Sequence, residues 1–298
     1  MPNQRDIISE IEKYSSDHSP LDFVRRKYLN ELNDFVNVGK EEKDKRDTII
    51  YASSYLSDNV QSSPSISIIK EDIRLLMAVM QGLKKKNLDI LLHSPGGTLE
   101  ATEQIVNYLR GRYKNIRVIV PMSAMSAATM LACAADEIII TKHGSLGPID
   151  PQYNGISVKT IISEFELAEK NVIANPNAAA LWLERIRHYP SYIECQGVLN
   201  ASQNRVSEWL TKYMQLPAKT AENISKWLAN ADEHGLHGRP ICFEELKSHG
   251  LKVSLLEDNQ EFQEKVLPVF HAMMATFDNA PCVKIVENQN GIGRYLKQ

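Results

Sequence analysis

Two segments of the sequence place serine hydroxyls and small residues where an apolar run ends and a helical pattern begins. The first, residues 91–97, reads Leu-Leu-His-Ser-Pro-Gly-Gly. Glycine permits a tight turn and leaves backbone N–H groups uncovered, and N–H groups at a helix N-terminus attract negative charge. This turn could therefore hold an oxyanion, although Pro-Gly-Gly is also a common structural turn.

The second segment centres on Ser126, which follows the apolar run Val118–Val120 and precedes a run rich in alanine. A hydroxyl at a strand-to-helix turn can act as a nucleophile when a base lies near it. Serine at such a position most often serves only as a helix N-cap. A third segment, residues 142–152, is dense in Gly, Pro and Asp, which predicts a shaped loop or a plain connection.

The elements that position these segments alternate along the chain from residue 47 to residue 141. Apolar β-like runs occupy 48–52, 88–93, 116–121 and 137–141, and helical patterns occupy 71–83, 99–112 and 126–135. This alternation predicts βαβ units around a mainly parallel sheet. Helices dominate after residue 155, and we expect them at 158–170, 178–188, 203–214, 217–228, 243–249 and 261–277.

The N-terminal part differs from the rest in its pattern of apolar and charged residues. Residues 1–33 show an amphipathic helical pattern, and residues 34–46 contain eight charged side chains in thirteen positions, typical of a solvated linker or helix end. We therefore predict two regions, a helical extension with a charged linker over 1–46 and one domain over 47–298.

Composition limits the classes of function. The chain of 298 residues carries 34 Lys and Arg against 37 Asp and Glu, a net charge of −3 that gives no general attraction to nucleic acid. The four cysteines form no CxxC pair, and the most apolar stretch, 118–135, contains proline, serine and threonine. We expect a cytoplasmic protein with no nucleic-acid partner, no indicated membrane association and thiols that stay reduced.

Metal and organic cofactors are not expected. The eight histidines show neither H-x₃-H nor H-E-x-x-H spacing, and no G-x-G-x-x-G follows any predicted strand. The sequence therefore predicts no metal site and no dinucleotide site.

The order of the three segments resembles that of the Clp-fold serine peptidases, which include the Clp protease proteolytic subunit and signal peptide peptidase A. Residues 126–136, Ser-Ala-Ala-Thr-Met-Leu-Ala-Cys-Ala-Ala-Asp, are similar to the nucleophile helix of signal peptide peptidases. Together with 91–97 and with Leu-Gly-Pro-Ile-Asp-Pro-Gln at 146–152, they resemble the serine dehydrogenase proteinase family over about residues 47–290. The resemblance implies an α/β fold, a Clp/crotonase-like ββα superhelix with helical additions at both ends.

The same resemblance implies the roles of individual residues. Ser126 would be the nucleophile of a serine endopeptidase, and the N–H groups of Gly96 and Ala127 would form the oxyanion hole. The supporting residues would be Gly97, which holds the turn, Ser94 and Ser123. Ala128 departs from the family pattern, which usually has glycine two positions after the nucleophile.

The identity of the general base stays open at this point. In the Clp protease subunit the base is a histidine that would fall in the loop 147–152, where this sequence has none. Signal peptide peptidases use a lysine some tens of residues after the nucleophile, which favours Lys170 and a Ser-Lys mechanism. The rival residues are His237, His188 and Asp150, and Asp150 could also orient a neighbour or hold its loop.

Two other classes of function are compatible with parts of this pattern. A crotonase-type acyl-CoA enzyme shares the fold and uses two backbone N–H groups without a serine nucleophile. A catalytically silent oligomeric scaffold would explain the unassigned base. For the peptidase, we expect a peptide or unfolded protein as substrate and, by resemblance to the ring-forming Clp-fold enzymes, a homo-oligomer.

Overall fold

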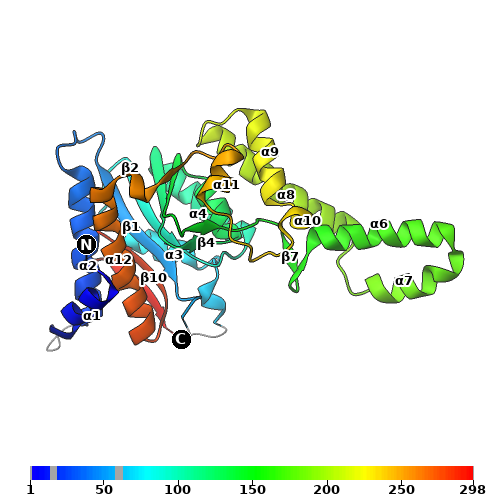
Figure 1. Cartoon of the computed structure of the whole chain (residues 1–298), viewed down its shortest axis with the longest axis horizontal. Helices are drawn as coiled ribbons and strands as arrows, with labels where there is room; N and C mark the ends of the chain where they lie inside the picture. Colours follow the sequence, from blue (N-terminus) through cyan, green and yellow to red (C-terminus); the bar gives the residue numbers. More distant parts are fainter. Residues whose placement is uncertain (1, 14–18, 58–62, 298) are drawn as a thin grey trace. The chain divides into compact units, whose positions relative to one another are not determined.

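The computed structural model describes residues 2–13, 19–57 and 63–297. The chain divides into two compact units, the first comprising Met1–Leu146 with Pro240–Gln298 and the second comprising Gly147–Arg239. Figure 1 labels the helices and strands of both units.

The first unit is built on a mixed sheet. In its described part, seven strands follow the order β11-β10-β1-β2-β3-β5-β9. Strands β1, β2, β3, β5 and β9 run parallel, and β10 and β11 are antiparallel to their neighbours. The bounds are β1 Arg46–Ser53, β2 Asn87–His93, β3 Asn115–Val120, β5 Glu137–Ile140, β9 Val253–Leu255, β10 Cys282–Asn288 and β11 Gly293–Lys297.

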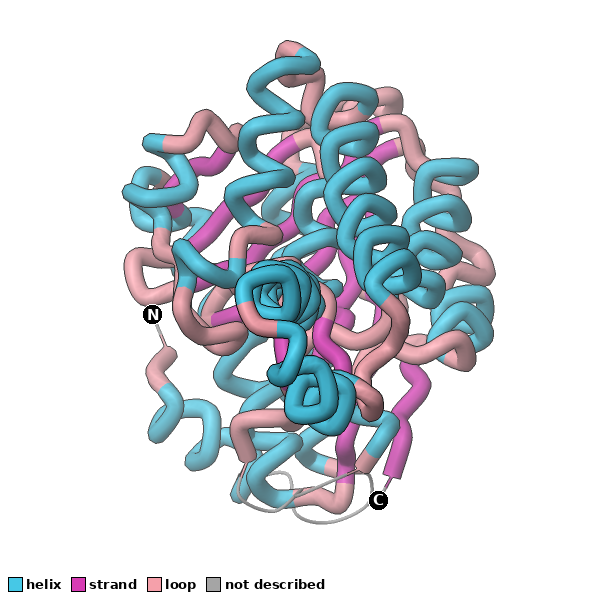
Figure 2. The backbone as a smooth tube through the Cα atoms, turned by 90° about the vertical axis from the view of Figure 1, so that its right-hand side faces the viewer, coloured by secondary structure: helices cyan, strands magenta, loops and turns pink. Residues whose placement is uncertain are grey.

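Helices cover both faces of this sheet, as Figure 2 shows. On one face, Ile50 of β1 and Leu91 of β2 share a core with Leu29 and Val266 from two long helices. On the other face, Ile90 of β2 lines one small cavity together with Val106 and Leu131. Because both faces are covered, the central strands are nearly continuous apolar runs, which is typical of parallel sheets.

The helices of the first unit lie before, between and after these strands. Their bounds are α1 Gln4–Lys13, α2 Pro20–Asn37, α3 Asp72–Val79, α4 Leu99–Arg112, α5 Ala127–Cys133, α11 Phe243–Ser248 and α12 Gln260–Asn279, with 3₁₀ turns η1 Pro64–Ile66 and η3 Leu256–Asp258. The helix expected over 71–83 ends at Val79, since Gly82 takes a positive φ of 83° in the following turn. The other elements expected between 47 and 141 agree within two residues.

The region 1–46, expected as an extension, is packed on the sheet. Helix α2 lies against α12 and β1. Arg25 of α2 is fully buried and pairs with Glu287 of β10, with 2.7 Å between Nε and Oε2. Residues 14–18 of this region lie outside the described residues.

A strand hairpin, which the residue pattern did not predict, follows the last helix. Strands β10 and β11 come after α12 and extend the sheet beyond β1. The mixed α/β architecture was anticipated and is confirmed, with this hairpin as an addition at the C-terminal end.

The second unit is mainly helical. It begins with a small hairpin, β7 Gln152–Tyr153 and β8 Ile156–Ser157, followed by α6 Val158–Ala174, η2 Pro176–Ala178, α7 Ala179–Ile186, α8 Tyr192–Lys212, α9 Ala218–Leu228 and α10 Ala231–His234. Helix α8 starts eleven residues earlier than expected because Ser191 and Glu194 form a capping box at its N-terminus. No helix within the described ranges is long and apolar enough to cross a bilayer.

Candidate active site

Ser126 occupies a strained turn in the first unit. It lies between the short strand β4 (Ser123–Ala124) and helix α5, with φ 52° and ψ −121°. A non-glycine residue in this region of backbone space costs on the order of 1–3 kcal/mol, and such strain clusters at functional sites. The hydroxyl makes no capping hydrogen bond. Ser126 therefore does not act as a helix N-cap. A serine on a strained backbone at a strand-to-helix turn has the arrangement typical of a nucleophile.

The glycine turn packs directly against Ser126. Gly96 has φ 94°, and a Cβ atom added to it would lie 2.5 Å from the carbonyl oxygen of Met125 and 2.7 Å from the backbone nitrogen of Ala127. It would also lie 2.8 Å from Cβ of Ser126. The structure thus brings together Gly96, Ser126 and Ala127, as the proposed oxyanion site requires.

Backbone hydrogen bonds hold the two turns in register. Ser94 donates its N–H to the carbonyl of Ser123 at 3.2 Å, and Met125 donates to the carbonyl of Ser94 at 2.9 Å. On the other side of the turn, a Cβ on Gly97 would lie 2.2 Å from the carbonyl oxygen of Ile68. Only glycine permits this approach, so Gly97 fixes the turn against the segment after η1.

The two candidate oxyanion donors differ in their present partners. Ala127 is the first residue of α5, so its N–H has no acceptor within the helix. The N–H of Gly96 donates to Oγ of Ser94 at 3.2 Å, a long bond. A substrate oxygen with developing negative charge is a stronger acceptor than a neutral hydroxyl, so it can compete for this donor.

Two aromatic side chains that were not among the predicted site residues, Tyr55 and His93, lie next to the turn. The hydroxyl of Tyr55 is hydrogen-bonded to Oγ of Ser123. The ring of His93 lies 4.9 Å from the ring of Tyr55, measured between centroids, and 5.9 Å from that of Phe270. Their one sequence signal is that His93, a polar residue, ends an apolar strand immediately before the glycine turn.

His93 is buried in its neutral form. It is 1% exposed, and neither ring nitrogen has a hydrogen-bond partner among the described residues. Burial lowers the pKa of His93 from 6.5 to about 4. Between these values the unfolded chain binds the proton more strongly, so stability must fall as the pH falls.

We expect the free energy of unfolding to drop by about 3 kcal/mol through His93 between pH 6.5 and pH 4. Urea unfolding at a series of pH values measures this slope. The His93→Phe variant keeps the aromatic packing and should show a shallower slope. An unchanged slope in that variant would mean that other groups cause the acid sensitivity.

Alanine in place of Gly96 should reduce hydrolysis at least 100-fold. The new methyl group would meet backbone atoms on both sides of Ser126, and alanine at φ 94° adds strain. The measurement is kcat/KM with a peptide substrate, together with thermal unfolding. Gly111→Ala is the matched control, because this helical glycine has no atom within 4 Å of the added Cβ and no positive φ. Equal activity of the two variants would contradict the packing argument.

The second unit pairs two of the candidate residues. Nδ1 of His237 lies 2.7 Å from Oδ1 of Asp150, and the Asp150 side chain is 2% exposed while that of His237 is 32% exposed. Gln152 donates to the other carboxylate oxygen at 2.6 Å. A carboxylate that accepts from Nδ1 leaves Nε2 unprotonated, which is the form that can take a proton.

The other candidate bases are exposed. Lys170 lies on the surface of α6, and His188 lies on the surface beyond α7, where it is hydrogen-bonded to its neighbour Arg187. A lysine needs removal from water before it can act as a base near neutral pH. Across the described ranges, no group of three or more His, Cys, Asp or Glu side chains could hold a metal ion.

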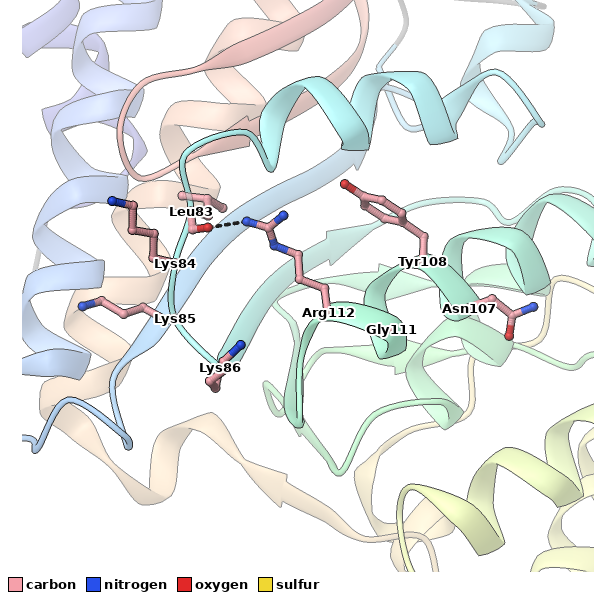
Figure 3. A pocket seen from close by; sticks show the side chains of 8 residues that line it. All are labelled: Leu83, Lys84, Lys85, Lys86, Asn107, Tyr108, Gly111 and Arg112. Carbon is pink, nitrogen blue, oxygen red and sulfur yellow. Dashed lines mark hydrogen bonds between the residues drawn. The ribbon is translucent and has the colours of Figure 1, made fainter.

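A basic hollow of about 680 Å³ lies on another part of the first unit. Figure 3 shows the loop 83–86, with its three lysines, facing the last turns of α4. Arg112 donates to the carbonyl of Leu83 across it. Its lining includes none of the residues at the Ser126 turn.

A strained serine beside a glycine turn, on an α/β sheet, is the arrangement expected of the ClpP-like class of proteins. The chain belongs to the ClpP-like SDH-type serine proteinase family, whose sequence profile matches residues 65–276. The matched range includes the glycine turn, Ser126, Asp150 and His237. The family and fold class expected from the sequence are confirmed.

Two relatives come from Methanocaldococcus jannaschii. The uncharacterized protein MJ0137 is 32% identical over 187 residues, which cover 62% of this chain and 59% of the relative. The uncharacterized protein MJ1495 is 34% identical over 97 residues, or 33% of each chain. The chain therefore matches less than two thirds of the length of either relative.

Two solved structures are similar to this chain, both of the 1510-N membrane-bound stomatin-specific protease. A serine-to-alanine mutant shows 18% identity and a TM-score of 0.41, covering 67% of this chain and 79% of its own. A lysine-to-alanine mutant in complex with a substrate peptide shows 18% identity and a TM-score of 0.40, covering 78% and 82%.

Proposed function

We propose that this chain is an endopeptidase that hydrolyses peptide bonds with Ser126 as its nucleophile. The observation that carries the proposal is the contact of the strained Ser126 turn with the Gly96 turn. Oγ of Ser126 attacks the peptide carbonyl as a base removes its proton. The N–H groups of Gly96 and Ala127 then stabilise the oxyanion, each contributing roughly 2.7–4 kcal/mol.

After the attack, the leaving amine must be protonated and the acyl-enzyme must be hydrolysed. The base, now protonated, donates its proton to the leaving amine, and an acyl-enzyme ester forms on Ser126. Water then attacks this ester with help from the same base, which releases the acid product and restores the serine. One side chain therefore serves as base and as acid, so its pKa must suit both roles.

We infer that His237, oriented by Asp150, is that base, ahead of Lys170. The 2.7 Å bond to a buried carboxylate fixes the tautomer and the orientation of the imidazole. Lys170, in contrast, is exposed on α6. The sequence alone favoured Lys170 by resemblance to signal peptide peptidases, and it stays the rival in the experiment below.

Exchange of His237 for alanine should lower kcat/KM roughly 1,000-fold or more, while Lys170→Ala should leave it within about threefold. The rate at which a fluorophosphonate labels Ser126 provides a second readout. Asp150→Asn should also lower the rate strongly, since it removes the carboxylate that orients the imidazole. Loss of activity in Lys170→Ala, with His237→Ala active, would assign the base to Lys170.

The proposal extends to the substrate, the assembly and the location. A peptide or an unfolded protein segment fits a serine peptidase, and we propose a homo-oligomer in the cytoplasm, as the sequence suggested. Neither crotonase-type acyl-CoA chemistry nor a silent scaffold accounts for a strained, uncapped serine in a serine proteinase family.

A further inference from the structure

The strand that leads into the nucleophile turn is very short. Strand β4 consists of Ser123 and Ala124, which pair with β6 (Ser145–Leu146) on one side, while Ala124 bridges to Ser94 on the other. Ser126, two residues further along the chain, has a strained φ of 52°. Backbone strain of this kind persists only where the surrounding structure fixes the chain firmly. Side-chain contacts to β4 therefore help to set the position of the nucleophile.

Tyr55 makes such a contact from the end of a neighbouring strand. Its hydroxyl is hydrogen-bonded to Oγ of Ser123, a residue that is 8% exposed. The backbone of Ser123 takes part in the same arrangement, because its carbonyl accepts the N–H of Ser94 at 3.2 Å. Ser94 begins the glycine turn, so Ser123 joins Tyr55, the glycine turn and the strand before the nucleophile.

Tyr55 itself is held firmly in place. The preceding residue, Ser54, is fully buried and donates both its N–H and its hydroxyl to the carbonyl of Val283 on β10, at 3.0 and 3.3 Å. The ring of His93 packs against the ring of Tyr55 and, on its own far side, against that of Phe270. The main chain and the ring of Tyr55 are therefore both fixed, and the hydroxyl occupies a defined point beside β4.

The histidine beside Tyr55 lowers the stability of the fold. Neither nitrogen of the buried His93 ring has a hydrogen-bond partner among the described residues. The backbone of Ser123 opposes the lowering of the His93 pKa by burial, so the ring lies near Ser123 without the geometry of a hydrogen bond. A buried donor without a partner costs about 1–3 kcal/mol, which an apolar ring would avoid. Unpaired buried groups of this kind are found at catalytic sites more than in plain core packing.

We propose that Tyr55 is a positioning residue for the peptidase reaction and that it acts through its hydrogen bond to Ser123. The inference rests on the proposed function, since it assigns a role beside the Ser126 nucleophile. The bond holds β4 against the glycine turn, which keeps Oγ of Ser126 aligned with the N–H groups of Gly96 and Ala127. Without the bond the nucleophile shifts, and a shift of about 1 Å can cost up to 100-fold in rate.

Tyr55→Phe tests this role, because it removes only the hydroxyl and keeps the ring that packs against His93. We expect kcat for a peptide substrate to fall 10-fold or more, with KM within about twofold of the parent value, since the bond aligns the nucleophile and does not hold the substrate. The rate of fluorophosphonate labelling at Ser126 should fall by a similar factor. Tyr108→Phe, at a half-buried tyrosine of α4, is the matched control and should keep the parental kcat.

A double-variant cycle tests whether Tyr55 acts through Ser123. Ser123→Ala removes the other half of the bond, so it should also lower kcat 10-fold or more, while Ser126 is still labelled but more slowly. Because both changes break the same bond, the double variant Tyr55→Phe, Ser123→Ala should be about as slow as either single variant. A double variant roughly 100-fold slower than the parent would show that the two hydroxyls act separately, and it would overturn the proposal.

The outcomes also separate this inference from the proposed function. A parent protein that hydrolyses no peptide and is not labelled at Ser126 refutes the proposed function and this inference with it. A labelled, active parent with Tyr55→Phe at the parental kcat overturns the positioning role alone. A Tyr55→Phe protein that melts at a lower temperature but keeps the parental kcat while folded assigns Tyr55 to packing, with the same result. If Tyr55→Phe does not fold, Ser123→Ala decides, and a parental kcat in that variant overturns the proposal.

Discussion

Replacing Ser126 with alanine should abolish labelling by a fluorophosphonate and lower peptide hydrolysis roughly 10⁴-fold or more. The hydroxyl is the attacking group in the proposed reaction, and among the described residues no other serine has a positive φ. Because the side chain makes no capping hydrogen bond, its removal should change the melting temperature by no more than about 2 °C. Mass spectrometry of the labelled protein and thermal unfolding measure both effects on one sample.

Two further variants complete this test. Ser123→Ala changes the neighbouring hydroxyl of the same turn and should keep covalent labelling. Ser126→Gly should be as inactive as the alanine variant but more stable by about 1 kcal/mol, because glycine adopts a φ of 52° without strain. Persistent labelling of Ser126→Ala would refute the assignment of the nucleophile.

The largest loss of stability is expected from Lys284→Met. Nζ of Lys284 lies 2.7 and 2.8 Å from the two carboxylate oxygens of Asp72 and 2.7 Å from the carbonyl of Ser67, with both side chains of the pair fully buried. Tyr51 donates to the same carboxylate. Removing the ammonium leaves a buried, uncompensated charge, so the free energy of unfolding should fall by about 3–5 kcal/mol.

Equilibrium urea unfolding measures this loss, and two controls interpret it. Lys265→Met removes one partner of an exposed pair with Glu31 and should cost no more than about 1 kcal/mol. The double variant Asp72→Leu, Lys284→Met replaces both charges with apolar groups and should recover much of the loss. A single variant as stable as the parent protein would show that the pair does not stabilise the fold.

The sequence by itself determined the features that depend on contiguous residues. Apolar runs and helical periodicity placed β2, α4, β3 and α5 within two residues, because buried elements repeat their pattern locally. The glycine turn and Ser126 were identified for the same reason, since each motif is a short unbroken segment. These segments also carried the resemblance to the family.

Only the tertiary structure decided the features that join distant parts of the chain. The bond between Asp150 and His237 spans 87 positions, and the bond between Tyr55 and Ser123 spans 68. The hairpin β10–β11 joins the sheet beside β1, although most of the chain separates these strands in the sequence. No local pattern encodes such pairs, because their free energy comes from burial and hydrogen bonds that exist only when the chain is folded.

The base of the proposed reaction is the clearest example of a feature that the sequence left open. From the sequence, Lys170 and His237 were both plausible, because either side chain can remove a proton in a suitable environment. The fold leaves Lys170 in water and places His237 against a buried carboxylate. The residue type is written in the sequence, but its protonation chemistry depends on burial and on its neighbours, which are set by tertiary packing.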